Sequence, residues 1–499
     1  MNFMKKMTAP FIALVLALFV TVSSDAQRLV LQGDHPDPSV TKIGDDYWAS
    51  ATTSNWMPVY PLLQSKDLVN WTPKGFVFNK LPKWADYYFW APEISYENGK
   101  VYVYYAAHKK GGNLCLGIAT ANKPEGPYKD LGPMMCQEVG SIDAFPMRDE
   151  NGKLWLIWKE DANSVKLPTP IWAQELKEDR SGLVGEKHEL FRNKVAWEEN
   201  LVEGVSMIRH NGYFYAFYAA AGCCGVGCTY VVGVARSKNL LGPWEKDPAN
   251  PILKNTNQWI CPGHGTAIEK DNKFYFLHHA YDKKTNAFTG RQGVLSEFKF
   301  TSDNWVQFVV NPAPIPKPEP VTDNFDGRSL SMNWEWSVFQ KIKSKVKNGT
   351  VELKALNTPS GAFLGQKILT GDFTATTTIL RKNTKAAAGI GAIGDEKNVL
   401  SVLYSGDSVR LIKLKEDSVT TLAVRPLAVQ DKVNFKVQVT GGRYFTFSYA
   451  ADGGNYTVIN DKPVDAIFLP PWDRAIRIGL FSKGSRGKAV FDSFQMISD

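Results

Sequence analysis

Residues 98–102 read Asn98-Gly99-Lys100-Val101-Tyr102, a tight-turn dipeptide followed by a strand-forming run. Asn-Gly is a strong hairpin signal, because both central residues of a type I′ turn need a positive φ. A turn followed by an aromatic strand occurs four more times, beginning at Gly44, Asn151, Asn211 and Asn272. The intervals of about 53 to 61 residues are typical of propeller blades built from short strands. The sequence therefore predicts an all-β fold that contains a five-bladed β-propeller.

One position in each repeat carries a chemically distinctive side chain. Eight residues before the turn lie Trp90, Asp143, Glu203 and His264, and Asp37 takes the equivalent place in the first repeat. The innermost strand of every blade lines the central channel, so we expect these five side chains to converge. Three carboxylates brought together repel one another and lose hydration, which is costly unless some chemistry uses them.

Such a ring has the groups that hydrolysis of a glycosidic bond requires. One carboxyl group protonates the leaving oxygen and a second activates water or attacks the anomeric carbon. A third carboxylate can raise the pKa of the acid. Trp90 offers a flat face to a sugar, and His264 could donate a hydrogen bond, tune a carboxylate or ligate a cation. Each residue alone has an ordinary structural explanation, but their common offset favours function.

The first 26 residues have the features of a signal peptide. Lys5 and Lys6 precede an apolar run over residues 11–22, and Ser24 and Ala26 are small residues at the positions that signal peptidase reads. An apolar run of this length is shorter than the ~20 residues that span a bilayer. We therefore expect no membrane span, a mature chain that begins near Gln27, and a secreted or periplasmic location.

Cysteine usage agrees with an oxidising compartment. Cys223, Cys224 and Cys228 lie in one Gly-rich segment that could suggest a metal site, but no histidine or second cysteine pair completes a zinc pattern. A loop held by disulfides, including a vicinal one, fits the segment better. The other three cysteines are Cys115, Cys136 and Cys261, and the sequence leaves the pairing open.

A proline-rich segment at 312–320 divides the chain, because alternating prolines favour a stiff, extended connector. We expect the propeller over residues 27–311 and a second domain over 321–499, where strand-like runs alternate with turn residues as in a two-sheet β-sandwich. The formal net charge of +8 is mild for 499 residues. No basic stripe interleaved with aromatic residues is present, which argues against nucleic acid as a partner.

The propeller segment resembles glycoside hydrolase family 43 in six motifs, which cover about residues 30 to 310. They are His35-Pro36-Asp37-Pro38-Ser39, Trp90-Ala91-Pro92-Glu93, Ser141-Ile142-Asp143-Ala144-Phe145, Val202-Glu203-Gly204-Val205-Ser206-Met207, Pro262-Gly263-His264-Gly265 and Gly290-Arg291-Gln292. Residues 323–327 and 330–336 resemble, more loosely, the jelly-roll (concanavalin-like) domain that follows the propeller in many xylosidases and arabinofuranosidases of the family. That domain could bind glycan, or it could only brace the propeller and close one side of the pocket.

The resemblance implies an inverting mechanism with a role for each acid. Asp37 is the general base, Glu203 is the general acid, and Asp143 orients the acid and raises its pKa. Two departures from the family pattern, Ala144 and Val205, remove no functional atom but can alter the pocket wall.

The resemblance also implies substrate contacts. Trp90 and Phe145 wall the first sugar subsite, Arg291 hydrogen-bonds the sugar hydroxyls, and His264 contacts substrate. In some relatives the histidine equivalent to His264 helps to hold a calcium ion through waters, although the chemistry itself requires no cofactor.

The function expected from these observations is removal of terminal pentose units from plant oligo- or polysaccharides by an exo-acting hydrolase. The α-L-arabinofuranosyl unit is the first choice and the β-D-xylosyl unit the second. Three alternatives remain open at this point: an exo-galactan hydrolase, a carbohydrate-binding propeller without turnover, and a retaining hydrolase in which Asp37 is the nucleophile.

Overall fold

The computed structural model describes residues 26–428 and 431–499. Almost all regular structure in these ranges is β-strand, and the only helical segments there are short 3₁₀ turns: Ala162–Val165, Ala196–Glu198, Asn286–Phe288 and Arg381–Asn383. Within the same ranges no helix is long and apolar enough to cross a membrane. The expected signal peptide lies, apart from Ala26, outside the described residues.

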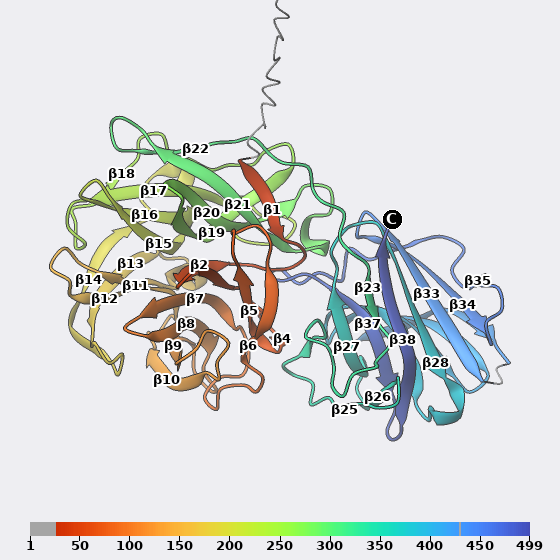
Figure 1. The fold of residues 1–499 in the computed structure, drawn as a ribbon. Helices are drawn as coiled ribbons and strands as arrows, with labels where there is room; N and C mark the ends of the chain where they lie inside the picture. The colour runs from red at the N-terminus through yellow and green to blue at the C-terminus, as the bar shows by residue number, and fades with distance from the viewer. Residues whose placement is uncertain (1–25, 429–430) are drawn as a thin grey trace, which may run out of the picture.

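Five antiparallel sheets form the propeller (Figure 1). Blade 1 contains β2 (Ser39–Ile43), β3 (Asp46–Ser50), β5 (Val59–Ser65) and β6 (Thr72–Phe78). Blade 2 contains β7 (Trp90–Glu97), β8 (Lys100–His108), β9 (Leu114–Ala121) and β10 (Lys129–Met135). Blade 3 contains β11 (Ser141–Arg148), β12 (Leu154–Glu160), β13 (Pro170–Leu176) and β14 (Leu183–Arg192).

The fourth and fifth blades complete the ring. Blade 4 contains β15 (Val202–His210), β16 (Tyr213–Ala220), β17 (Val231–Ser237) and β18 (Glu245–Lys246). Blade 5 contains β19 (Trp259–Lys270), β20 (Lys273–Asp282), β21 (Arg291–Phe300), β22 (Val306–Phe308) and, from the other end of the domain, β1 (Gln27–Leu31). Five blades confirm the predicted architecture.

The predicted hairpins join the first and second strands of each blade. Asn98 and Gly99, between β7 and β8, have φ of 52° and 75°. Asn211 and Gly212, between β15 and β16, have φ of 46° and 77°. These values satisfy the type I′ requirement that the Asn-Gly dipeptides indicated.

The ring closes because β1 pairs with β21, so that the start of the domain supplies a strand to its last blade. Leu31 is 4% exposed and lies over Gly293 of β21. A Cβ on Gly293 would stand 2.7 Å from the Leu31 Cβ, so the close approach of the two strands requires glycine there.

The second domain is a β-sandwich of two antiparallel sheets, as predicted (Figure 1). The larger sheet contains β23 (Val321–Asp323), β25 (Ser344–Val346), β26 (Val351–Lys354), β28 (Phe373–Leu380), β33 (Lys432–Thr440), β34 (Tyr444–Ala451), β35 (Thr457–Val458), β36 (Val464–Asp465) and β38 (Lys488–Ser498). The smaller sheet contains β27 (Ala362–Lys367), β29 (Ala387–Asp395), β30 (Asn398–Ser405), β31 (Ser408–Lys415), β32 (Ser418–Pro426) and β37 (Arg477–Lys483).

The two domains are joined by more than the connector. β24 (Trp336–Ser337) of the sandwich pairs with β4 (Trp56–Met57) of the propeller. Arg477, which is 1% exposed, forms ion pairs with Asp34 of the propeller and Glu335 of the sandwich. Because a buried guanidinium needs its partners, this network strongly favours one docking geometry.

All six cysteines are paired in the structure. The disulfides are Cys115–Cys136, Cys223–Cys224 and Cys228–Cys261. The second is vicinal and lies in the loop between β16 and β17.

Candidate active site

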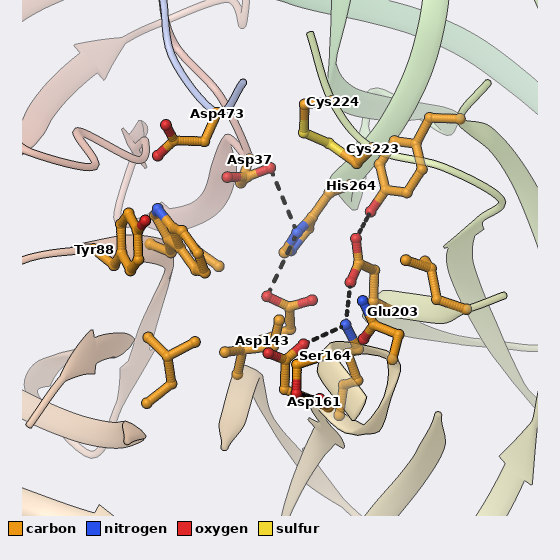
Figure 2. Close-up of a pocket in the computed structure, with 18 of the residues that line it drawn as sticks. Asp37, Tyr88, Asp143, Asp161, Ser164, Glu203, Cys223, Cys224, His264 and Asp473 are labelled. Atoms are coloured by element: carbon orange, nitrogen blue, oxygen red, sulfur yellow. Dashed lines mark hydrogen bonds and ion pairs between the residues drawn. A yellow bond between two sulfur atoms is a disulfide. The ribbon is translucent and has the colours of Figure 1, made fainter. Parts of the chain in front are cut away.

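The five ring positions come together as the sequence predicted. Asp37, Trp90, Asp143, Glu203 and His264 all line one pocket of about 350 Å³ at the centre of the propeller. Figure 2 shows Asp37, Asp143 and His264 close together, with Glu203 beside them. Residues that are 53 or more positions apart in the chain thus become neighbours because each blade points its first strand at the same axis.

Irregular backbone at the inner strands directs these side chains into the pocket. The pairing register shifts between Ile142 and Phe145 in blade 3 and between Glu203 and Ser206 in blade 4. Asp37 and Asp143 have φ of 49° and 60°, a conformation unusual for a residue with a side chain. Bulges of this kind re-aim side chains next to active sites.

Asp37 is held as a carboxylate. The Thr52 hydroxyl donates to its Oδ2 at 2.7 Å, and Arg291 Nη1 donates to its Oδ1 at 2.9 Å. Its backbone N–H donates to Nδ1 of His279 at 3.1 Å, and burial lowers the pKa of His279 to about 4, so that ring is neutral. Burial alone would raise the pKa of Asp37, but the Arg291 charge, together with the contacts of the carboxylate with His279 and His264, outweighs burial and holds the pKa well below its usual range.

Asp143 is the carboxyl group that carries a raised pKa. Burial raises it to about 6, with help from the charges of Glu203 and Asp37 and against those of His264 and Lys159. Its Oδ2 accepts a hydrogen bond of 2.8 Å from the backbone N–H of Gly204, directly after Glu203. Asp143 therefore positions the backbone beside Glu203 and does not hydrogen-bond the carboxyl group of Glu203.

The pKa of Glu203 is lowered, whereas we expected Asp143 to raise it. Lys159 Nζ lies 2.5 Å from Glu203 Oε2, and the Tyr230 hydroxyl donates to Oε1 at 2.6 Å. Burial alone would raise the pKa of Glu203, but these two contacts outweigh burial and lower it. The reason is direct contact, because Lys159 touches the carboxylate whereas Asp143 touches the following amide.

Lys159 and Tyr230 were missed by the sequence reasoning. Lys159 is only 1% exposed and ends the run Leu154-Trp155-Leu156-Ile157-Trp158, in which every side chain is buried. A lysine that continues a wholly apolar strand toward the channel was the signal that could have identified it, because a buried ammonium requires an anionic partner.

His264 lies between two of the acids. Its Nδ1 is 3.7 Å from Asp37 Oδ1 and 3.9 Å from Asp143 Oδ1. Among the described residues no group of three or more His, Cys, Asp or Glu side chains is arranged to hold a metal ion. Calcium takes six to eight oxygen ligands, so His264 and the two carboxylates beside it do not make a calcium site by themselves.

The apolar wall includes Trp90 but not Phe145. The Trp90 ring stacks on Tyr88 with centroids 4.4 Å apart, and its Nε1 donates to Ser54 Oγ at 3.0 Å. The prediction for Phe145 is wrong, because this ring is 8% exposed and lies in a hydrophobic cluster between blades 3 and 4. The bulge between Ile142 and Phe145 sends Asp143 to the pocket and Phe145 to the core.

Arg291 lines the pocket, but protein groups occupy both of its terminal nitrogens. Nη1 contacts Asp37, and Nη2 donates to the backbone oxygen of Asp473 at 2.9 Å. In the structure Arg291 therefore helps to keep Asp37 ionised, and its place in the pocket lining leaves the expected contact with sugar hydroxyls as a prediction.

The sandwich domain also reaches the pocket. Trp472 and Asp473, in the segment between β36 and β37, belong to its lining. Trp472 meets the Trp90 ring edge-on at a centroid distance of 5.8 Å, and the Asp473 carboxylate accepts a hydrogen bond from Ser54. Sequence reasoning did not find these residues, because no local pattern shows which sandwich loop faces the propeller.

Comparison with known proteins adds to this geometry. Residues 26–306 match the model of glycosyl hydrolases family 43. The chain belongs to this family. Residues 322–496 match a model described as the β-xylosidase C-terminal concanavalin A-like domain.

Individual proteins are similar to this family 43 chain over most of its length. A non-reducing end α-L-arabinofuranosidase of Bacteroides ovatus is 24% identical, over 90% of each chain. A xylan 1,3-β-xylosidase of a Vibrio species is 26% identical over 62% of this chain and 64% of its own length. The crystal structure of a xylan β-1,4-xylosidase from Bacillus halodurans has a TM-score of 0.80 at 20% identity and covers 94% of this chain and 99% of its own. The family 43 chain is thus a glycoside hydrolase, which excludes the alternative of a propeller without turnover.

Proposed function

We propose that the enzyme is an exo-acting, inverting hydrolase that removes terminal pentose units from plant oligo- or polysaccharides, with α-L-arabinofuranosyl units preferred over β-D-xylosyl units. The observation that carries the proposal is the convergence of Asp37, Asp143 and Glu203 on one pocket. Its volume of about 350 Å³ is at the small end for ligand sites, which suits a chain terminus. The sandwich segment at Trp472 borders the pocket, which favours exo-action.

In this proposal Asp37 is the general base. It is ionised at neutral pH because of Arg291, and so it can accept a proton from the water that attacks the anomeric carbon. Inversion follows if that water, rather than Asp37 itself, forms the new bond.

Glu203 is the general acid and must carry a proton when the sugar is bound. In the ligand-free arrangement the proton is held more readily by Asp143, whose pKa is about 6. Lys159 Nζ also contacts Asp161 at 2.9 Å, so it keeps an anionic partner when Glu203 becomes neutral.

A panel of nitrophenyl glycosides tests the substrate class. We expect turnover of the α-L-arabinofuranoside, less of the β-D-xyloside and least of the β-D-galactoside. Asp37→Asn and Glu203→Gln should each lower kcat by about 10²–10⁴-fold. Glu175→Gln, a matched change at the Lys153 surface ion pair, should leave kcat unchanged. Normal turnover by both pocket variants would refute the assignment of the acids.

Proton NMR of the first-formed sugar distinguishes inversion from retention. We expect the anomeric configuration opposite to that of the substrate. The same configuration would instead make Asp37 a nucleophile. Fast turnover of the galactoside with none of either pentoside would favour the galactan-cleaving alternative.

We further propose that the enzyme acts outside the cytoplasm. Its six cysteines are all paired, which supports folding in an oxidising compartment. Cleavage after Ala26 would leave the closing strand β1 complete from Gln27. Mass spectrometry of protein from culture medium and periplasm should find an N-terminus at or near Gln27, and an uncleaved cytoplasmic chain would contradict export.

A further inference from the structure

The Cys223–Cys224 disulfide lines the pocket that holds the three acids. Both cysteines are half-buried. In Figure 2 the disulfide lies near Asp37 and His264, on the side of the pocket away from Tyr88. None of the roles assigned above to the acids uses it.

The loop that carries this disulfide is held from three sides. The Cys228–Cys261 disulfide ties it to β19, and the Gly225 N–H donates to the Tyr281 hydroxyl at 3.0 Å. A Cβ on Gly225 would lie 3.1 Å from the backbone oxygen of Trp472, so the sandwich segment touches the loop as well. The two sulfurs therefore present a fixed surface.

The chemistry of that surface contrasts with its neighbours. A disulfide has no proton to donate, its sulfurs accept hydrogen bonds weakly, and sulfur is polarisable. Around it stand charged groups: Arg291 Nη1 lies 3.8 Å from Cys223 Sγ and 2.9 Å from Asp37 Oδ1. A sugar has polar hydroxyls at its edge and C–H groups on its faces. The weakly polar disulfide can contact a C–H face while the neighbouring carboxylates accept hydrogen bonds from the hydroxyls.

We propose that the Cys223–Cys224 disulfide is a substrate-positioning surface on which the C–H face of the terminal sugar packs, while the sugar hydroxyls face the carboxylates. The inference deepens the proposed function and rests on it. The contact exists in the bound substrate and in the transition state alike, so its loss weakens binding without slowing the chemical step.

Replacement of both cysteines tests the proposal on the full chain. For Cys223→Ala with Cys224→Ala we expect KM for the preferred pentoside to rise about tenfold and kcat to stay within about twofold. The pH profile of kcat should be unchanged. Cys115→Ala with Cys136→Ala is the matched control, because it removes a disulfide outside the pocket lining and should leave KM unchanged.

Thermal unfolding identifies variants that have not folded. If the alanine pair is unfolded, Cys223→Ser with Cys224→Ser retains side chains of similar size and replaces sulfur with a polar group, and the same rise in KM is expected. An unchanged KM in a folded variant would overturn the proposal. A fall in kcat with an upward shift of the acid limb of the pH profile would also overturn it, because the disulfide would then only support Arg291 and Asp37.

Failure of this inference can be told apart from failure of the proposed function. If wild type hydrolyses pentosides and the variant has the same KM, only the role of the disulfide fails. If wild type hydrolyses no pentoside, the proposed function fails. In that case calorimetry can still measure the affinities of wild type and of the double-cysteine variant for free L-arabinose and D-xylose. Equal affinities of the two proteins would reject the disulfide as a sugar-binding surface.

Discussion

At the scale of single residues, two aspartates of the pocket have different pKa values because their surroundings differ. Asp37 and Asp143 are both buried and both have positive φ, yet the pKa of Asp37 is lowered and that of Asp143 is raised to about 6. The difference comes chiefly from Arg291, which contacts Asp37 directly, whereas Asp143 accepts a hydrogen bond from a backbone N–H, and the charges of His264 and Lys159 do not outweigh its burial and the neighbouring carboxylates. Such divergence allows one carboxyl group to act as a base while a neighbour holds a proton.

Arg291→Gln should shift the pH dependence of the enzyme. The base must be ionised, and removal of the guanidinium raises the pKa of Asp37, so the acid limb of the kcat/KM profile should move upward by about 1–3 pH units. Arg291→Lys keeps the charge and should restore most of the profile. An acid limb that stays in place in Arg291→Gln would show that Asp37 does not need this partner.

Asp143→Asn should stabilise the fold while it impairs catalysis. The folded-state pKa of Asp143, about 6, lies above the value of about 3.9 expected in the unfolded chain. The folded state therefore binds the extra proton between these values, and wild type loses stability as pH rises from about 4 to 6. Asn cannot ionise, and its side-chain oxygen can still accept from the Gly204 N–H.

The Tm of Asp143→Asn should accordingly exceed that of wild type by a few degrees at pH 8 and equal it at pH 4. Scanning calorimetry at both values measures the difference. A gap that is the same at both pH values would mean that Asp143 does not carry the raised pKa.

At the scale of elements, the closing strand and the bulged inner strands shape the site. β1 pairs with β21, so that blade 5 and with it His264 are held in the ring by residues from the start of the domain. The bulge in β11 decides which of its side chains face the pocket, and the wrong prediction for Phe145 follows from that single irregularity.

Leu31→Ala should test the closure of the ring. Leu31 is 4% exposed and packs on Gly293, so truncation should lower the free energy of unfolding by about 2–5 kcal/mol. Leu167→Ala is the matched control, because Leu167 is 57% exposed and its loss should change the free energy of unfolding by no more than about 0.5 kcal/mol. Equal effects in denaturant titrations would show that β1 does not stabilise the domain.

At the scale of the whole molecule, the sandwich domain contributes to the pocket of the propeller. Arg477 anchors β37 to Asp34, and the segment just before β37 brings Trp472 and Asp473 to the pocket. The docked sandwich therefore completes one side of the pocket, which favours a bracing role for this domain.

Trp472→Ala should weaken binding without unfolding the protein. Trp472 is 54% exposed and meets Trp90 edge-on, so its loss should raise KM about three- to tenfold and leave kcat nearly unchanged. Tyr444→Ala removes another exposed aromatic residue of the same domain and should leave KM as it is. An unchanged KM in Trp472→Ala would place this residue outside the substrate-binding surface.

The amino-acid sequence by itself determined the propeller, the sandwich and the convergence of Asp37, Trp90, Asp143, Glu203 and His264. The reason is that turn chemistry and strand alternation are local, and a regular repeat converts a local offset into a common direction. Only the tertiary structure decided which charges touch which acids, where Phe145 points, and that Trp472 borders the pocket. These features depend on a bulge in one strand, on a buried lysine and on the docking of two domains. The contacts of the lysine and of the domains join residues that are distant in the chain, and no local pattern shows the bulge.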